Sequence, residues 1–345
     1  MRFGCLTEKG HAEVRERPIR ALGPHDVLIR QLTCNICTTD YQQWMGLREH
    51  QGYPMAGGHE GAGLVSEVGD AVHTVAPGDL VAINSYLGCG YCEACKLGEV
   101  SRCPDAPPYL TPDGYRGEFG FSTHSIWDEG VLLKMNADLD PACAGFLEPL
   151  STVVKGHKKL RLAPFETVLV IGAGTMGLLN ALAARARGAR VLITELMDKK
   201  LDAARAAGLE VIDAGKEDPV ARVMELTGGV GADCAIVAVG NTKANTQAID
   251  SVKKIDGRIL LFAAGYPVPQ IEIDSNIVHY RRLELIGTYG ADNADFMDAA
   301  RMLNAGLLDV SGLIEPKRYP LTQIQDAFAA ASTPGMYRVC VECQR

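Results

Sequence analysis

The sequence has few aromatic residues and no excess of positive charge. Aromatic side chains make up 6% of its 345 residues, whereas glycine occurs 37 times. This composition is typical of an alanine- and glycine-rich α/β enzyme rather than of an all-β sandwich. The formal net charge of -8 argues against a nucleic-acid partner, because nucleic-acid-binding domains carry a basic surface.

Long apolar segments are missing as well. The longest uncharged stretch, Val168 to Ala184, is too short to span a membrane and contains the polar and small residues Gly172, Gly174, Gly177 and Asn180. The first residues, MRFGCLTEKGHAEVRERP, contain no apolar segment of signal-peptide length. Eleven cysteines in a chain of this length are too few for a disulfide scaffold. We therefore expect a cytoplasmic protein without a membrane partner.

Four of the cysteines are closely spaced, in the pattern Cys89-x2-Cys92-x2-Cys95-x7-Cys103. Four thiolates at such spacing can enclose Zn²⁺ and leave no open position, so this zinc would stabilise the fold and take no part in chemistry. An iron–sulfur site is the nearest alternative because Pro104 follows the last cysteine, but the final gap is seven residues instead of three. A zinc module for nucleic acid is disfavoured because the intervening charges balance.

Two domains are expected, because a chain of 345 residues exceeds the size at which a single core stops growing. Residues 1–150 contain short β-type runs that are separated by glycine, proline and aspartate. From Val168 onward, short apolar strands alternate with helical stretches, which is typical of βαβ units and a parallel sheet. Near the end of the chain, Tyr337 to Val341 is predicted as one more strand, which could return to the first domain.

A dinucleotide-binding fingerprint begins this second region. The predicted strand Val168 to Ile171 runs into Gly172-Ala173-Gly174-Thr175-Met176-Gly177 and then a helix, which places a pyrophosphate at the helix N-terminus. The next strand ends at Glu195, whose carboxylate can accept hydrogen bonds from the ribose hydroxyls and repels a 2'-phosphate. We therefore expect NAD in preference to NADP, although Lys199 and Lys200 follow closely. The predicted cofactor-binding residues are Gly172, Gly174, Thr175, Met176, Gly177, Glu195 and Lys200.

Two further motifs precede the cysteine quartet. The first is Cys37-Thr38-Thr39-Asp40, and the second is Gly58-His59-Glu60-x2-Gly63-x5-Gly69-x2-Val72. With these motifs the chain resembles the zinc-containing medium-chain dehydrogenase/reductase family over nearly its whole length. The resemblance implies a GroES-like β-rich catalytic domain at 1–153 and 289–345, with a zinc lobe at 86–106. It also implies a Rossmann domain with a doubly wound parallel sheet at 154–288.

The resemblance also implies a catalytic zinc, in addition to the zinc of the quartet. Cys37 and His59 would bind it, with Glu60 as a ligand or immediately behind one, and Glu148 of the segment Phe146-Leu147-Glu148-Pro149-Leu150 as a further ligand. Three protein ligands leave the fourth position of zinc open for a substrate oxygen. The remaining residues implied at the site are Thr39 as proton relay, Asp40 as the partner that orients His59, and Arg338 as a contact of the cofactor pyrophosphate.

The Glu-Pro-Leu segment indicates the polyol branch, which is similar to sorbitol dehydrogenase. We expect NAD-linked oxidation of a secondary hydroxyl of a polyol or sugar-derived alcohol, in a homotetramer or homodimer that pairs the edge strand at 283–287. The alternatives are an amino-alcohol or L-threonine-type dehydrogenase, a zinc-free quinone reductase, and a redox sensor that binds NAD without turnover. The last is disfavoured because Cys37, His59 and Thr39 are all present. Candidates for the pocket lining are Trp44, Met45, Tyr109 and His124.

Overall fold

The computed structural model describes residues 1–49, 52–108, 110–265 and 267–345. The chain divides into two compact units. Unit 1 comprises Met1–Ser151 and Ala291–Arg345, and unit 2 comprises Thr152–Gly290. No helix in the part of the chain that the structure describes is both long enough and apolar enough to cross a membrane.

Unit 1 is built on a seven-stranded sheet in the order β14-β15-β3-β4-β5-β7, with β6 paired to β3. A separate antiparallel pair, β1 (Arg2–Glu8) and β2 (His11–Glu16), lies outside this sheet. The sheet strands are β3 (Asp26–Ile36), β4 (Glu60–Val68), β5 (Leu80–Ile83), β6 (His124–Asp128), β7 (Leu132–Lys134), β14 (Tyr319–Pro320) and β15 (Val339–Glu342). The helices are α1 (Thr38–Trp44), α2 (Glu93–Lys96), α3 (Pro141–Ala144), α10 (Asn293–Asn304) and α11 (Ile324–Ala331), and α4 (Leu147–Leu160) begins in this unit.

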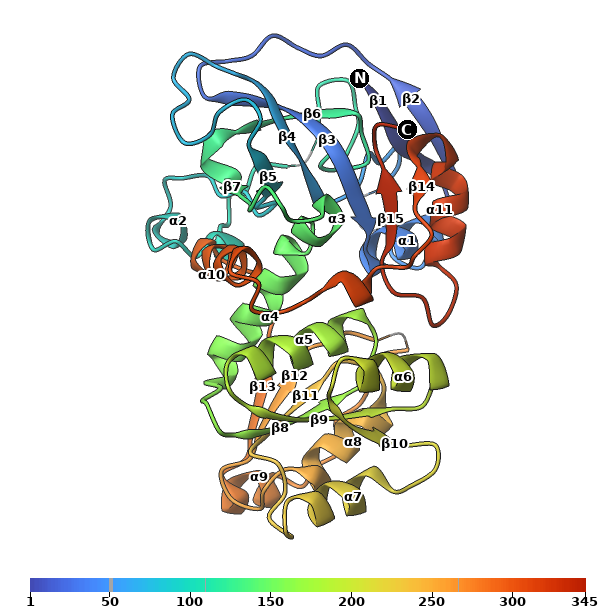
Figure 1. Cartoon of the computed structure of the whole chain (residues 1–345). Coiled ribbons are helices and arrows are strands. Elements are labelled where there is room, and N and C mark those ends of the chain that lie inside the picture. Colours follow the sequence, from blue (N-terminus) through green and yellow to red (C-terminus); the bar gives the residue numbers. More distant parts are fainter. Residues whose placement is uncertain (50–51, 109, 266) are drawn as a thin grey trace. The chain divides into compact units, whose positions relative to one another are not determined.

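The last strand of the chain completes the sheet of unit 1. β15 inserts beside β3 in antiparallel register, with Val339 opposite Ile36, and Figure 1 shows it next to α11. Its residues Val339 and Val341 are buried in one core cluster with Ile36 and the ring of Phe328. Because apolar burial is the main stabilising term of folding, this strand holds the C-terminal segment against the N-terminal part of the unit.

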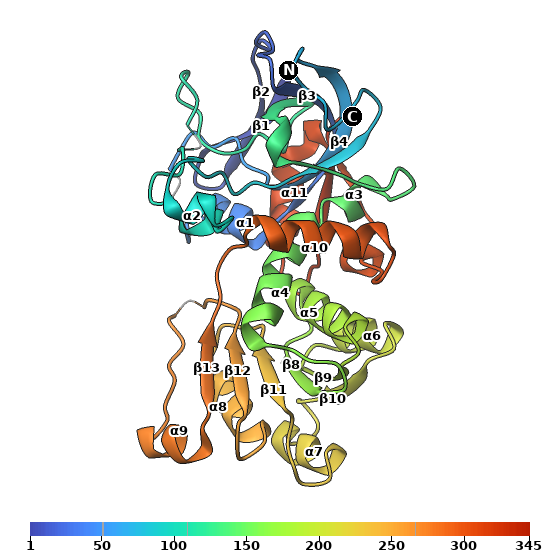
Figure 2. The same cartoon turned by 90° about the vertical axis from the view of Figure 1, so that its left-hand side faces the viewer.

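Unit 2 has a six-stranded sheet in the order β10-β9-β8-β11-β12-β13, and all neighbouring strands are parallel. In Figure 1, α5 and α6 lie on one face of this sheet and α7 and α8 on the other, and Figure 2 shows the strands from another side. The strand order reverses next to β8, and ligands of such sheets bind at the carboxyl ends of the strands there. The elements are β8 (Thr167–Ile171), α5 (Thr175–Ala186), β9 (Arg190–Glu195), α6 (Asp198–Ala206), β10 (Glu210–Asp213), α7 (Pro219–Leu226), β11 (Cys234–Val237), α8 (Thr242–Ser251), β12 (Arg258–Leu261), α9 (Ser275–Arg281) and β13 (Glu284–Gly287).

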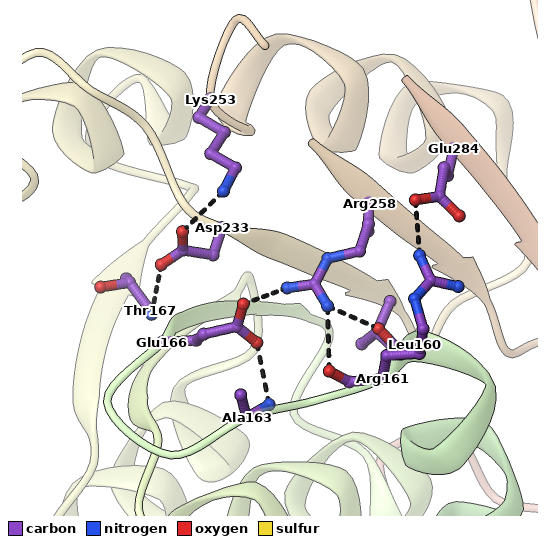
Figure 3. A network of polar contacts seen from close by, with 9 residues as sticks. All are labelled: Leu160, Arg161, Ala163, Glu166, Thr167, Asp233, Lys253, Arg258 and Glu284. Carbon is purple, nitrogen blue, oxygen red and sulfur yellow. Dashed lines mark hydrogen bonds and ion pairs between the residues drawn. The ribbon is translucent and has the colours of Figure 1, made fainter. Parts of the chain in front are cut away.

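A polar network fixes the opposite, amino-terminal ends of these strands (Figure 3). Arg258, the first residue of β12, is largely buried, pairs with Glu166 and donates to the carbonyl oxygens of Leu160 and Arg161 at 2.7 and 3.1 Å. The end of α4 is therefore attached to the sheet by a charged side chain. Beside it, Asp233 accepts hydrogen bonds from the backbone N–H of Thr167 and from Lys253.

Candidate metal and dinucleotide sites

Three strand ends meet at one edge of the sheet in unit 1. β3 ends one residue before Cys37, β4 begins one residue after His59, and β15 begins one residue after Arg338. The antiparallel register places Asn35 opposite Glu60 and Ile36 opposite Val339. Residues that lie 22 and 301 positions apart in the sequence therefore come together, and hydrogen bonding between strands is the physical cause.

Cys37, His59 and Glu60 form a compact group, in which one ligand atom from each residue lies within 4.8 Å of the others. Asp40 is fully buried beside them, and its Oδ1 lies 3.7 Å from Nδ1 of His59. The other oxygen, Oδ2, accepts a hydrogen bond of 3.0 Å from the backbone N–H of Cys37, which caps α1. Thr39 lies next to the thiol, with Oγ1 at 3.9 Å from Sγ of Cys37.

The electrostatics of this group favour a cation at its centre. Burial opposes a charged imidazole, but Asp40 and the Cys37 thiolate outweigh it and raise the pKa of His59 well above its usual range. Burial also raises the pKa of Asp40. Bound metal requires deprotonated ligands, and thiolate, imidazole and carboxylate are the donors that zinc takes in catalytic sites. The residues present therefore fit a zinc ion.

Arg338 forms a contact that the sequence did not indicate. Its Nε and Nη2 donate to the two carboxylate oxygens of Glu60 at 2.7 and 2.6 Å, and Nη2 lies 3.5 Å from Sγ of Cys37. Both side chains of this ion pair are almost completely buried. We expected Arg338 at the cofactor pyrophosphate; that role stays a prediction, whereas the structure places the guanidinium at the candidate metal site. Sequence spacing could not reveal this pair because its members are 278 residues apart.

Glu148 lies near the compact group but is not a member of it. It stands in the first turn of α4 and is buried. A side chain at Gly145 would come within 2.4 Å of the Glu60 carbonyl oxygen, so the loop before α4 lies directly against the start of β4. Burial raises the pKa of Glu148 to about 7, and among charged neighbours His59 and Arg338 lower this pKa while Glu60 and Glu118 raise it.

Glu118 is a carboxylate that the sequence analysis did not single out. Burial raises its pKa to about 7 against the attraction of His59, and Asp40 raises it further. It belongs to no motif, and its neighbours Gly117, Phe119 and Gly120 are ordinary turn and core residues. No signal in the sequence could have found it.

The cysteine quartet gathers its four sulfur atoms in unit 1. The four Sγ atoms lie within 4.8 Å of one another, with 4.0 Å between Cys89 and Cys95 and 3.8 Å between Cys92 and Cys103. Zinc–sulfur bonds of about 2.3 Å in a tetrahedron give sulfur separations of about 3.8 Å, so the arrangement fits a closed zinc site. Backbone N–H groups of Tyr91 and Cys92 lower the pKa of Cys89 to about 7, which favours its thiolate.

The glycine loop of unit 2 follows β8 directly. Gly172 has φ +96°, and a side chain at Gly177 would come within 1.8 Å of the Gly172 carbonyl oxygen, so both positions require glycine. Gly174 caps α5, with Thr175 and Met176 in the first turn behind it. A side chain at Gly174 would meet only Nζ of Lys200, at 3.8 Å, among the described residues. This open cradle at a helix N-terminus fits a pyrophosphate.

Glu195 lies beside the same loop, as the last residue of β9. Its Oε2 accepts a hydrogen bond of 2.8 Å from the N–H of Ala173, and Oε1 accepts two, from Leu196 and Met197 at 2.7 and 3.1 Å. Each carboxylate oxygen has two lone pairs. One acceptor position therefore remains on Oε2, next to the glycine loop.

The residues proposed for a pocket lining are spread over unit 1. Trp44 stacks on Phe328 with ring centroids 6.4 Å apart, and Met45 follows it at the end of α1. His124 is the first residue of β6, where it pairs with Arg30 of β3. Tyr109 lies outside the described residues.

Two family models match the chain. The alcohol dehydrogenase GroES-like domain matches residues 23–137, and the zinc-binding dehydrogenase model matches residues 175–305. L-Threonine 3-dehydrogenase of Pyrococcus horikoshii is 30% identical over 336 residues, which cover 93% of this chain and 92% of the relative. Sorbitol dehydrogenase of Bacillus subtilis is 28% identical, with 96% and 93% covered. A zinc-binding dehydrogenase of Sinorhizobium meliloti, solved with bound NADP, superposes with a TM-score of 0.86 at 25% identity and 99% and 98% coverage.

These matches define a zinc-type alcohol dehydrogenase with a GroES-like domain and a Rossmann-type domain. The chain belongs to the zinc-containing medium-chain dehydrogenase/reductase family, whose members are oxidoreductases that act on CH–OH groups. The predictions of family, fold class and enzyme class from the sequence are thus confirmed. The relatives are dehydrogenases of different hydroxyl compounds.

Proposed function

We propose that this enzyme oxidises a secondary hydroxyl of a polyol or sugar-derived alcohol to the ketone, with NAD as the hydride acceptor. The observation that carries the proposal is the convergence of Cys37, His59 and Glu60 beside Arg338 at one edge of a sheet. Zinc, when bound, supplies a Lewis acid for the substrate hydroxyl, and the nicotinamide supplies a hydride acceptor. The side chains of this protein would bind the metal and the cofactor, orient the ligands and transfer the proton.

Cys37, His59 and Glu148 are the ligands that we assign to the catalytic zinc. Both carboxylate oxygens of Glu60 already accept hydrogen bonds from Arg338, so Glu60 would have to give up a buried ion pair in order to bind metal. Removing one partner of such a pair is costly. Glu148→Gln should therefore release zinc from this site, whereas Glu60→Gln should retain it; the reverse pattern of metal content would exchange their roles.

Thr39 and Asp40 lie next to two of these ligands, Cys37 and His59. The Thr39 hydroxyl, 3.9 Å from Sγ of Cys37, would take the proton of the substrate hydroxyl while it gives its own proton to a cofactor ribose hydroxyl or water. Asp40 faces Nδ1 of His59 at 3.7 Å, which leaves Nε2 for the metal and holds the ring in one orientation. The quartet would hold a second zinc, so we expect two zinc ions per chain.

NAD is the cofactor that the Glu195 site favours. The lone pair that remains on Oε2 can accept a hydrogen bond from a ribose hydroxyl, while a carboxylate at this position repels a 2'-phosphate. Lys200, close to Gly174, supplies a positive charge at the position of the pyrophosphate. The S. meliloti structure carries NADP, so both cofactors require measurement. We expect kcat/KM to be higher with NAD, and Glu195→Ser to lower that preference; a wild-type preference for NADP would overturn the assignment.

The polyol assignment has one rival with support of its own, an L-threonine-type dehydrogenase, because the P. horikoshii relative is 30% identical. The B. subtilis relative, a sorbitol dehydrogenase, supports the polyol. Initial rates with sorbitol, xylitol, 2,3-butanediol, 2-butanol and L-threonine, each with NAD and NADP, separate the two. Turnover of L-threonine alone would favour the rival, and fewer than two zinc ions per chain or no turnover of any hydroxyl substrate would overturn the proposal.

We also propose that two copies pair through β13, one of the two edge strands of the parallel sheet. Unpaired edge strands are templates for pairing with another chain. Apolar and aromatic side chains are exposed on and near it, among them Leu285, Tyr280 and Tyr289. Leu285→Lys should shift the mass in light scattering from an oligomer toward a monomer, and a wild-type monomer would contradict this interface.

A further inference from the structure

Glu118 lies on a segment that runs alongside the residues leading to His59. The N–H of Ala56 donates to the Arg116 carbonyl at 2.6 Å, the N–H of Phe119 donates to the Ala56 carbonyl at 2.9 Å, and the N–H of Phe121 donates to Gly57 at 3.3 Å. These bonds pair the segment 116–121 with residues 56–57, immediately before the candidate ligand. Glu118 stands in the middle of the paired segment.

Glu118 is partly buried, and one oxygen of its carboxylate lacks a donor in the described part of the chain. Its Oε2 is inaccessible to solvent and has no hydrogen-bond partner among the residues that the structure describes. The charges of His59 and Asp40 shift the pKa of Glu118, and Glu118 in turn raises the pKa of Glu148. Glu118 therefore shares the charge environment of the catalytic centre. Leaving a buried acceptor without a donor costs about 1–3 kcal/mol and more for a charged group. A residue retained at such a cost is expected where a ligand supplies the missing donor.

The charges around Glu118 limit which donor can fill the position. The acidic side chains Asp40, Glu60 and Glu148 lie in the same region of unit 1, and Arg338 is already paired with Glu60. A second negative group, such as a substrate carboxylate or phosphate, would be repelled by this carboxylate. A hydroxyl or an ammonium group would be attracted, because either can donate to a carboxylate.

We propose that Glu118 accepts a hydrogen bond from a donor on the carbon next to the oxidised CH–OH group, and that it thereby selects substrates with two neighbouring polar groups over simple alcohols. The inference rests on the proposed function and deepens it, since it states what the substrate must carry. Polyols and β-hydroxy amines both satisfy the requirement, through a hydroxyl and an ammonium group respectively. Hydroxy acids with a carboxylate at that carbon do not.

The test compares four substrates of equal chain length on the zinc-loaded enzyme with NAD. 2-Butanol has no neighbouring donor, 2,3-butanediol has a hydroxyl on the neighbouring carbon, 3-amino-2-butanol has an ammonium group there, and 3-hydroxy-2-methylbutanoate carries the repelled carboxylate there. We expect Glu118→Leu to lower the ratio of kcat/KM for 2,3-butanediol over 2-butanol by about 10- to 100-fold, the value of a hydrogen bond to a charged group. Glu118→Gln keeps an acceptor oxygen but no charge, so it should lose mainly the 3-amino-2-butanol preference.

Asp113→Leu is the matched control, because Asp113 is an exposed carboxylate three residues before the segment 116–121; the ratio should not change. Thermal unfolding supplies a readout apart from activity: Glu118→Leu removes the buried oxygen Oε2 that has no donor among the described residues, so its Tm should equal or exceed that of the wild type. A lower Tm, or an unchanged substrate ratio, would overturn the inference. If the wild type oxidises none of the four substrates, the proposed function itself fails, whereas turnover without any effect of Glu118 on the ratio rejects the inference alone.

Discussion

The cysteine quartet and the Cys37 site assemble their ligands in opposite ways. The quartet takes its four sulfurs from 15 consecutive residues, Cys89 to Cys103. The other site takes Cys37, His59 and Glu60 from the ends of two strands and Arg338 from near the end of the chain. A closed metal site can therefore be encoded by local spacing, while an open site depends on the completed sheet.

The surroundings of the ligands differ in the same sense. Sulfurs of the quartet accept hydrogen bonds from backbone N–H groups. The N–H of Cys89 donates to Sγ of Cys103 at 3.3 Å, and the N–H of Cys92 donates to Sγ of Cys89 at 3.4 Å. The Cys37 site interacts electrostatically with ionisable side chains instead, namely Asp40, Glu118, Glu148 and Arg338. Backbone N–H groups can stabilise thiolates whichever side chains surround them. An ionisable side chain, in contrast, can be removed by a single substitution.

The largest expected effect comes from removing one cysteine of each site. Cys92→Ser opens the quartet, and because a structural zinc contributes folding free energy directly, we expect poor expression or a Tm lowered by many degrees. Cys37→Ser should leave a folded protein that binds NAD but oxidises no substrate. Zinc content, Tm and NAD binding by fluorescence quenching are measured for both variants. Equal losses of stability would contradict the assignment of a structural role to the quartet and a catalytic role to the Cys37 site.

This contrast also explains what could be predicted from the sequence. The spacing Cys89-x2-Cys92-x2-Cys95 and the glycine loop at Gly172 are local patterns. The structure formed by each of them fits the ligand that the pattern predicts. Cys37 and His59 could be paired only through the family resemblance. The contact of Arg338 with Glu60 and the position of Glu118 depend on strand register and loop packing, which single-sequence patterns do not determine.

Removal of Arg338 should have the next largest effect on stability. It tests whether charge pairing distinguishes the Cys37 site from the quartet. Arg338→Met leaves Glu60 buried without its partner, a change that costs about 3–5 kcal/mol. The double variant Arg338→Met/Glu60→Gln should recover part of this loss, because no unpaired charge remains. Urea unfolding of both proteins measures the difference. Full stability of Arg338→Met would mean that the ion pair contributes nothing, and the contrast with the backbone-bonded quartet would then lose its main support.

Asp40 provides a smaller effect that should be confined to one site. Asp40→Asn keeps the shape of the side chain and weakens its attraction for His59, so zinc affinity at the Cys37 site should fall about 10- to 100-fold. The quartet should keep its metal. Competition with a chelator, followed by zinc analysis, should show one zinc per chain lost early and one retained. Simultaneous loss of both ions would indicate that the sites are coupled and that the comparison is too simple.

The smallest effect concerns a hydrogen bond between the cysteine lobe and α10, and it tests how local the quartet is. Asp292 caps α10, and its Oδ1 also accepts a hydrogen bond of 3.0 Å from the N–H of Ser101. Asp292→Ala therefore removes a helix cap, worth about 1 kcal/mol, together with the link to the lobe. Asp274→Ala is the control, because Asp274 caps α9 through Asn276 in unit 2.

If the lobe depends only on its own zinc and backbone, both variants should lose about 1 kcal/mol by urea unfolding, and chelator should remove the quartet zinc at the same rate from each. A faster release from Asp292→Ala alone would show that α10 helps to hold the lobe closed. In that case the quartet, although its ligands are consecutive, would share the dependence on distant residues that distinguishes the Cys37 site.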